Sequence, residues 1–171
     1  MITIRPEQSG DIGAVRALNE AAFGDTAEAS IVDSLRMACP DAVSLVAVEG
    51  DRILGHILFT PAFAAGGRGV TQGMGLAPMA VLPERQRQGI GTMLIQAGTE
   101  AIRRRDCPFI IVVGHPEYYP RFGFVRASLH GLSCQWAGVP DEAFMVLILD
   151  ESAMAGVRGV ARYRDEFDEA M

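Results

Sequence analysis

The chain has 171 residues, of which 49% are hydrophobic, and a formal net charge of −6. This length predicts a single domain over residues 1–171, with 150–171 as a C-terminal extension of uncertain structure. The acidic balance argues against a nucleic-acid partner. Because the sequence has neither a long apolar run nor an export signal, we expect a cytoplasmic protein with no membrane contact.

In chain order, the hydrophobic pattern changes between the periods of strands and helices. A short strand precedes two amphipathic helices and a hairpin, and a glycine-rich segment that we expect to be flexible follows. Next come a central strand, a long amphipathic helix and three strands, of which the last is expected at a sheet edge before a polar, frayed tail. The predicted ranges are 3–5, 12–23, 27–37, 43–48, 52–59, 66–75, 76–82, 89–105, 109–113, 143–149, 157–163 and 164–171.

Pro78 is unusual because it lies within the predicted central strand. Proline has no backbone N–H to donate to a neighbouring strand, so it favours a bulge or a locally unpaired position. The alternative interpretation is that Pro78 marks the beginning of the strand. The sequence gives the two interpretations equal support.

The segment 79–92 predicts an anion-binding turn between the central strand and the long helix. Gly89 and Gly91 stand at the beginning of the helix, where backbone N–H groups are free and the helix dipole is positive. Without a Cβ atom, glycine lets a phosphate approach the main chain closely. Arg85 and Arg87 add positive charge, and a pyrophosphate is the expected ligand.

Two common phosphate-binding motifs do not match this turn. A P-loop requires a lysine, and the chain contains none. A dinucleotide-binding fingerprint requires a third glycine where Leu94 stands. A nucleotide-binding α/β domain therefore has little support.

The remaining pattern, Gln86-x-x-Gly89-x-Gly91, resembles the pyrophosphate-binding motif of the GNAT superfamily of N-acetyltransferases. A second motif about thirty residues later strengthens the resemblance, because Tyr119 stands four residues before the pair Gly123-Phe124. The resemblance implies an α/β (α+β) fold. Its mixed, mostly antiparallel sheet would have about seven strands, flanked by helices and splayed between strands 4 and 5.

The resemblance also implies an activity. GNAT enzymes move an acetyl group directly from acetyl-CoA to an amine, here of a small molecule or a protein. An unpaired N–H near Ala80 or Val81, exposed by the splayed strand, would polarise the thioester carbonyl, and the glycine-rich turn would hold the pyrophosphate. The expected CoA-binding residues are Ala80, Val81, Gln86, Arg87, Gln88, Gly89, Ile90, Gly91 and Thr92.

Tyr119 is the candidate general acid that protonates the leaving thiolate, with Tyr118 in reserve because Pro120 interrupts the local helix. The alternative for Tyr119 is a packing role among aromatic side chains. His115 is a weak candidate for the base, since its unperturbed pKa suits proton transfer. It could equally be a structural residue at the beginning of a helix.

An alternative function is a non-catalytic acyl-CoA-binding sensor or interaction module on the same fold. Cys39, Cys107 and Cys134 show no metal-ligand spacing, so we expect reduced thiols and no metal. Plentiful apolar and edge-strand surface makes a homodimer possible.

Overall fold

The structure is a computed structural model, and it describes residues 1–67 and 69–170. Its central element is a nine-stranded sheet with the order β1-β2-β3-β4-β5-β8-β6, to which β9 adds beside β3 and β7 adds beside β9. The strands are β1 (Ile2–Pro6), β2 (Val43–Glu49), β3 (Arg52–Ala65), β4 (Val70–Val81), β5 (Phe109–Val113), β6 (Val125–Arg126), β7 (Leu132–Cys134), β8 (Phe144–Ile148) and β9 (Gly159–Arg162).

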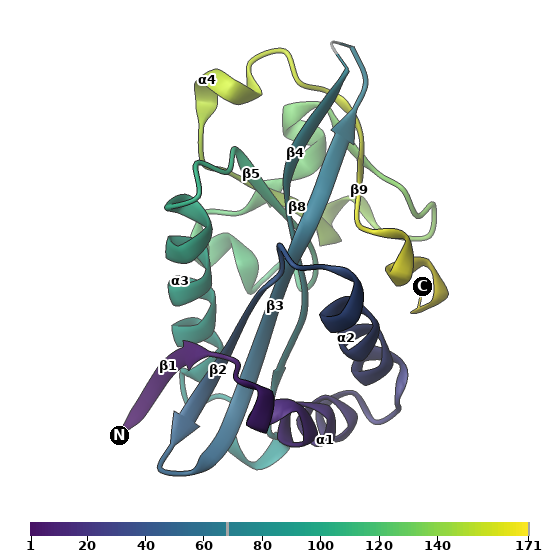
Figure 1. The fold of residues 1–171 in the computed structure, drawn as a ribbon. Helices are drawn as coiled ribbons and strands as arrows, with labels where there is room; N and C mark the ends of the chain where they lie inside the picture. Colours follow the sequence, from purple (N-terminus) through teal and green to yellow (C-terminus); the bar gives the residue numbers. More distant parts are fainter. Residues whose placement is uncertain (68, 171) are drawn as a thin grey trace.

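Helices cover both faces of this sheet. In Figure 1, α1 and α2 lie on one side of β3 and α3 lies on the other. The helices are α1 (Ile12–Phe23), α2 (Ala27–Ala38), α3 (Ile90–Arg103) and the single turn α4 (Glu151–Met154). Short 3-10 turns connect the elements: η1 (Ser9–Asp11), η2 (Pro83–Arg85), η3 (Tyr119–Phe122), η4 (Ala127–His130), η5 (Asp141–Ala143) and η6 (Asp165–Ala170).

The helices pack through the apolar faces that the sequence indicates. Val15 and Leu18 of α1 are buried in the core on one face, whereas Leu94 and Ile102 of α3 are buried in the core on the other. Among the described residues, no helix has both the length and the apolar character needed to cross a bilayer.

Most strand pairs are antiparallel, and the described exceptions are β4 with β5 and β7 with β9. The mixed, mostly antiparallel sheet is therefore confirmed, although it has nine strands instead of about seven. The prediction of an edge strand over 157–163 is wrong, because β9 lies between β3 and β7. The prediction of a frayed tail is also wrong, since Phe167 in η6 is 6% exposed.

Of the glycine-rich segment 66–75, predicted to be a flexible loop, residues 70–75 instead form the beginning of strand β4, and residue 68 lies outside the described residues. Two glycines of this part of β4 face aromatic rings. A Cβ atom on Gly75 would lie 2.6 Å from the ring of Tyr163, and one on Gly73 would lie 2.7 Å from the ring of Phe109. Glycine in a strand often marks such a close approach, and its lack of a side chain hid the strand period.

Strand β4 carries the bulge that Pro78 suggested. Ile57 pairs with Met79 and Phe59 pairs with Leu76, so β4 holds one more residue than β3 between these pairs. Because β4 already begins at Val70, Pro78 does not mark its beginning. The parallel pairing with β5 covers only Met74 to Leu76. The expected divergence of strands 4 and 5 is therefore confirmed.

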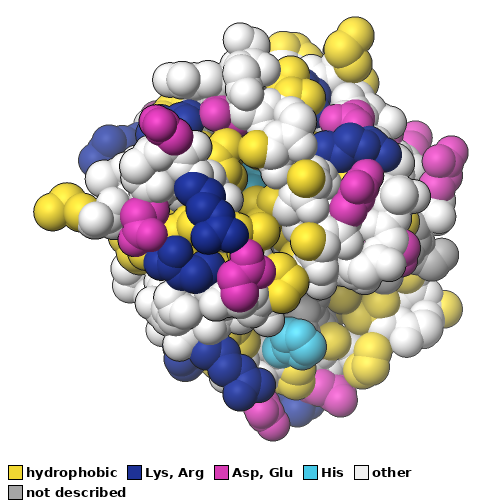
Figure 2. Space-filling model, turned by 90° about the horizontal axis from the view of Figure 1, so that it is seen from below, with side chains coloured by type: hydrophobic (Ala, Val, Ile, Leu, Met, Phe, Trp, Pro, Cys, Tyr) yellow, Lys and Arg dark blue, Asp and Glu magenta, His cyan; other side chains and the backbone are white. Residues whose placement is uncertain are grey.

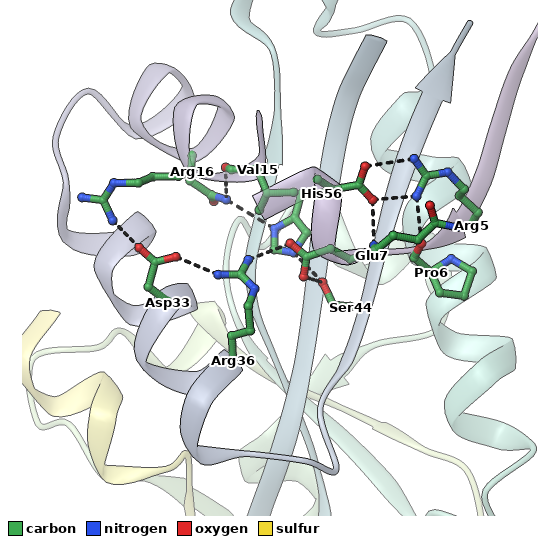
Figure 3. A network of polar contacts seen from close by, with 12 residues as sticks. Arg5, Pro6, Glu7, Val15, Arg16, Asp33, Arg36, Ser44 and His56 are labelled. Atoms are coloured by element: carbon green, nitrogen blue, oxygen red, sulfur yellow. Dashed lines mark hydrogen bonds and ion pairs between the residues drawn. The ribbon is translucent and has the colours of Figure 1, made fainter. Parts of the chain in front are cut away.

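A buried polar network joins the sheet to α1 and α2 (Figure 3). Ser44 Oγ donates to Glu7 Oε1 at 2.9 Å, so it accepts the Nε2–H of His56 at 2.9 Å. Asn19 Nδ2 lies 3.3 Å from His56 Nδ1, which accepts this hydrogen bond. In this arrangement both ring nitrogens of a neutral imidazole have hydrogen-bond partners. Burial and the positive charge of Arg36 lower the pKa of His56 to about 3.

This pKa predicts acid sensitivity. In the unfolded chain His56 has a pKa of about 6.5, so below this pH it is protonated there while native His56 stays neutral. The free energy of unfolding therefore falls with decreasing pH until the pH nears the native pKa. Between neutral pH and about pH 5 the loss attributable to His56 is about 2 kcal/mol. Urea unfolding of His56→Gln should show a pH dependence that is flatter by this amount.

The matched control is His130→Gln, because His130 is exposed on η4. This variant should keep the wild-type dependence. Equal pH dependence in His56→Gln and the wild type would contradict a neutral, buried His56.

Candidate active site

A cavity of about 850 Å³ opens where β4 and β5 diverge. Its wall includes Ile90 and Tyr119, which belong to the core beneath α3, and also Ile31 and Tyr163, which belong to the core beneath α1 and α2. The cavity therefore connects the two faces of the sheet. Such a passage requires a gap between neighbouring strands, and the divergence of β4 from β5 supplies it.

The first turn of α3 borders this cavity. Gly89 is the N-cap residue, with φ at 86°, and Arg87 two residues earlier has φ at 63°. Such left-handed turns make backbone N–H groups converge on an anion. The first recorded helical bond of α3 runs from Met93 N to Gly89 O, and the N–H groups of Ile90, Gly91 and Thr92 lie before it. The backbone thus forms a concave donor surface.

Some side chains beside this turn line the cavity and others do not. Gln88 contacts the turn itself, donating to Glu84 O at 3.4 Å, and it does not line the cavity. Gln86 lines the cavity while donating to Val81 O at 3.1 Å. Arg87 and Arg121 line it as well. Figure 2, which views the molecule from below Figure 1, shows arginine side chains beside exposed hydrophobic ones.

The direction of the β4 amides distinguishes Ala80 from Val81. Leu82 N donates to Leu54 O of β3, and residues two apart in a strand face the same neighbour. Ala80 N–H is therefore directed to β3, whereas Val81 and Met79 present their N–H groups to the gap. Val81 and Met79 line the cavity and Ala80 does not. Of the two predicted carbonyl-polarising residues, only Val81 has the required orientation.

Tyr118 and Tyr119 approach the cavity from η3 and the residue before it. The Tyr118 hydroxyl lies over the first turn of α3, since a Cβ atom on Gly91 would be 2.6 Å from it. Arg121 stacks on the Tyr118 ring with its guanidinium carbon 4.6 Å from the centroid. Tyr119 is 7% exposed, packs edge-on against Phe124 and still lines the cavity. Burial, with a smaller contribution from Tyr118, raises the pKa of the Tyr119 phenol.

Tyr163, which the sequence analysis did not single out, stands where the strands separate. Its hydroxyl donates to Leu76 O of β4 at 3.0 Å, and Ile111 O of β5 lies 3.3 Å away as an alternative acceptor. Burial and the nearby Tyr119 raise the pKa of Tyr163, so it stays protonated and can donate. Tyr163 belongs to no motif, and it lies at the end of the strand predicted over 157–163, so the sequence alone does not distinguish it. The run of closely spaced glycines opposite it was the available signal.

His115 lines the cavity with an exposed side chain, and its carbonyl oxygen accepts from Tyr118 N at 3.1 Å. Its role as a base stays a prediction. Among residues 1–67 and 69–170, no three His, Cys, Asp or Glu side chains are grouped as around a metal ion. Cys39, Cys107 and Cys134 are free thiols.

The wall on the α2 side was also missed by sequence reasoning. It consists of aromatic residues from the C-terminal third of the chain together with residues at the α1–α2 junction. None of these positions belongs to a recognisable motif, and only the folded chain brings them together. They are Phe23, Glu28, Ile31, Trp136, Tyr163 and Phe167.

The comparisons with known proteins define the class of protein. The family model for the acetyltransferase (GNAT) domain matches residues 3–127. The chain therefore belongs to the GNAT family and is an N-acetyltransferase.

Individual relatives are similar in sequence to this chain over most of its length. YhbS of Escherichia coli strain K12, named as an uncharacterized N-acetyltransferase, is 32% identical over 166 residues, which cover 96% of this chain and 98% of YhbS. YjhQ of the same strain, also named as an uncharacterized N-acetyltransferase, is 40% identical over 125 residues, covering 71% of this chain and 68% of YjhQ.

Solved structures give the same result. The crystal structure of E. coli YhbS in complex with CoA matches with a TM-score of 0.89 and 31% identity, covering 98% of this chain and 92% of that one. A GNAT family acetyltransferase from Brucella melitensis in complex with acetyl-CoA matches with a TM-score of 0.80 and 32% identity, covering 98% of this chain and 99% of that one.

The position of Tyr163 predicts a stability effect. Tyr163→Phe removes the hydroxyl that joins β4 to β5 and leaves a buried carbonyl without its donor, so the free energy of unfolding should fall by about 1–3 kcal/mol in urea titrations. Tyr118→Phe is the control, because its ring is only partly buried and its hydroxyl lies over the α3 turn. If both variants are as stable as the wild type, the Tyr163 hydroxyl does not fasten the strands.

Proposed function

We propose that this chain is a cytoplasmic N-acetyltransferase of one domain, residues 1–171, which takes its acetyl group from acetyl-CoA. The acceptor is an amine of a small molecule or a protein. The observation that supports this most directly is the cavity between β4 and β5, which begins at the free amides of α3 and passes through the sheet. Two related enzymes that bind CoA or acetyl-CoA share the fold.

The α3 turn holds the pyrophosphate of the cosubstrate. Amides of Gly89 to Thr92 donate to its oxygens, and the guanidinium groups of Arg87 and Arg121 offset its charge. The Gln86 side chain links the turn to the carbonyl oxygen of Val81, which is the last residue of β4. The pantetheine arm then extends along β4 toward the gap, where the thioester is reached by the acceptor from the α2 side.

Val81 N–H and Met79 N–H face the gap and donate to the thioester oxygen as it gains negative charge. A preorganised donor of this kind contributes about 3 kcal/mol to transition-state stabilisation. The amine nitrogen bonds to the carbonyl carbon as the carbon–sulfur bond breaks. No covalent bond to the protein forms in this mechanism.

Tyr119 donates its hydroxyl proton to the departing sulfur. Its raised pKa keeps the phenol protonated before the reaction. The same apolar surroundings disfavour the thiolate anion and raise the pKa of the thiol, so burial shifts both groups in the same direction. Tyr118, over the first turn of α3, is better placed to contact the phosphate end. His115, at the cavity wall, is the candidate to accept the proton of the amine.

Other features complete the proposal. The non-catalytic alternative is not favoured, because the relatives are named as N-acetyltransferases. Free cysteines suit a reducing compartment. A homodimer would cover Val125 of the short strand β6 and Leu129 beyond it, which are 38% and 73% exposed.

Gly89→Glu tests the proposed pyrophosphate site at the first turn of α3. The substitution places a carboxylate at the turn, so CoA should no longer raise the melting temperature as it does for the wild type. Gly50→Glu is the matched control, since Gly50 also has a left-handed backbone with open space around it. Gly50→Glu should keep the protection. Full protection of Gly89→Glu would show that the pyrophosphate binds elsewhere.

Tyr119→Phe tests the acid. With an amine that supports turnover, kcat should fall by about 100-fold or more while the KM for acetyl-CoA changes little, because general acids contribute roughly 10²–10⁴ to rates. Release of free CoA thiol measures both constants. Tyr118→Phe should mainly raise the KM. If kcat falls in Tyr118→Phe and not in Tyr119→Phe, the acid is Tyr118. If the wild type turns over no amine of a broad panel, the non-catalytic alternative is supported.

A further inference from the structure

The two ends of the cavity carry opposite charge. The cations in its wall, Arg85, Arg87 and Arg121, all belong to the turn before α3 or to η3. On the α2 side, Glu28 is the one charged residue among the described residues that line it. The arginines suit the phosphates of the cosubstrate, which leaves the carboxylate for the other reactant.

One carboxylate oxygen of the half-buried Glu28 side chain has no partner in the part of the folded chain that the structure describes. Its Oε2 is inaccessible to solvent and has no hydrogen-bond partner within the described residues. Burial raises the pKa of the Glu28 carboxyl, a hydrogen bond from the backbone N–H of Glu28 opposes this shift, and the nearby Asp25 carboxyl adds to it. A cation or a strong donor that reaches this oxygen would stabilise the carboxylate.

Carboxylates near Glu28 are engaged differently. Asp25 accepts the N–H of Ala27 at 2.9 Å, and Glu166 accepts from Arg164 at 2.9 Å. Asp168 accepts the indole N–H of Trp136 at 2.8 Å. These carboxylates accept hydrogen bonds from other residues of the folded protein, whereas Oε2 of Glu28 accepts none within the described residues.

Aromatic rings face the same part of the cavity. Trp136 stacks on Tyr163 with the centroids 5.5 Å apart and the planes inclined by 22°, and Tyr163 packs against Phe167 at 5.0 Å. The bond from Trp136 to Asp168 fixes the indole in place. Rings of this kind bind an apolar body and also attract a cation through their faces.

We infer that the acceptor is a cationic amine with an apolar or aromatic body, and that Glu28 is the residue that selects it by binding its ammonium group. The inference rests on the proposed function, because it assigns the acceptor to the half of the cavity that the cosubstrate leaves open. Glu28 acts as a specificity residue. Acceptors with a carboxylate next to the amine are rejected, since Glu28 and Asp25 repel it.

Phenethylamine and phenylalanine test the inference, because they share a body and differ by one carboxylate. With saturating acetyl-CoA, kcat/KM for phenethylamine should exceed that for phenylalanine by about 10-fold or more, because carboxylates at close range in a partly buried site repel each other. Glu28→Gln should lower the value for phenethylamine by about 10- to 100-fold through KM, with the KM for acetyl-CoA within about threefold of the wild type.

Glu169→Gln is the matched control, because Glu169 is an exposed carboxylate on η6 outside this cavity. It should leave both amines unaffected. If Glu28→Gln does not fold, thermal protection of the wild-type protein in the presence of CoA replaces it, with phenethylamine compared against 2-phenylethanol. The ammonium compound should protect and the uncharged alcohol should not.

The outcomes separate the two proposals. Absence of protection by CoA in the wild type would overturn the proposed function. Protection by CoA together with equal use of phenethylamine and phenylalanine, equal protection by the alcohol, or an unchanged Glu28→Gln would overturn the role of Glu28 alone.

Discussion

Tyr163 fastens β4 to β5 at the last point where the two strands run side by side. Its hydroxyl reaches Leu76 O at 3.0 Å and has Ile111 O at 3.3 Å, and β4 pairs with β5 only as far as Leu76. Beyond that residue, the bulge at Pro78 turns β4 away. The gap that results exposes backbone donors of β4 and lets one cavity reach both faces of the sheet. Each proposed step of the reaction takes place along this gap.

In the proposed reaction, opposite charges at the two ends of the cavity direct each reactant to its own half. Arginines and free amides surround the α3 turn, whereas Glu28 and aromatic rings form the α2 side. Because the sheet lies between the two ends, the donor and the acceptor meet only where the strands part. The network around His56 and Arg36 holds α2 against the sheet, so it also fixes the element that carries Glu28.

Local signals predicted much of the fold and about half of the site. The helical period predicted α1 and α3, and the positions of Gly89 and Gly91 predicted where α3 begins, because these features depend on neighbours in the chain. Segment 70–75 was mistaken for a loop because its glycines hide the strand period. Glu28 and Tyr163 could not have been found by motif, since each acquires its surroundings from segments far away in the sequence. Tyr163 and Leu76, for example, are 87 residues apart.

That separation has a consequence for biosynthesis. On the ribosome, β3 and β4 emerge long before β9, so the nascent chain has no Tyr163 to hold the strands and no wall opposite α2. The flank of β3 that later pairs with β9 is exposed meanwhile, and unpaired strand edges invite association with other chains. The turn proposed to bind phosphate is complete once α3 has been made, whereas the proposed amine side begins with Glu28 in α2 and is completed only by Tyr163 and Phe167 near the end of the chain.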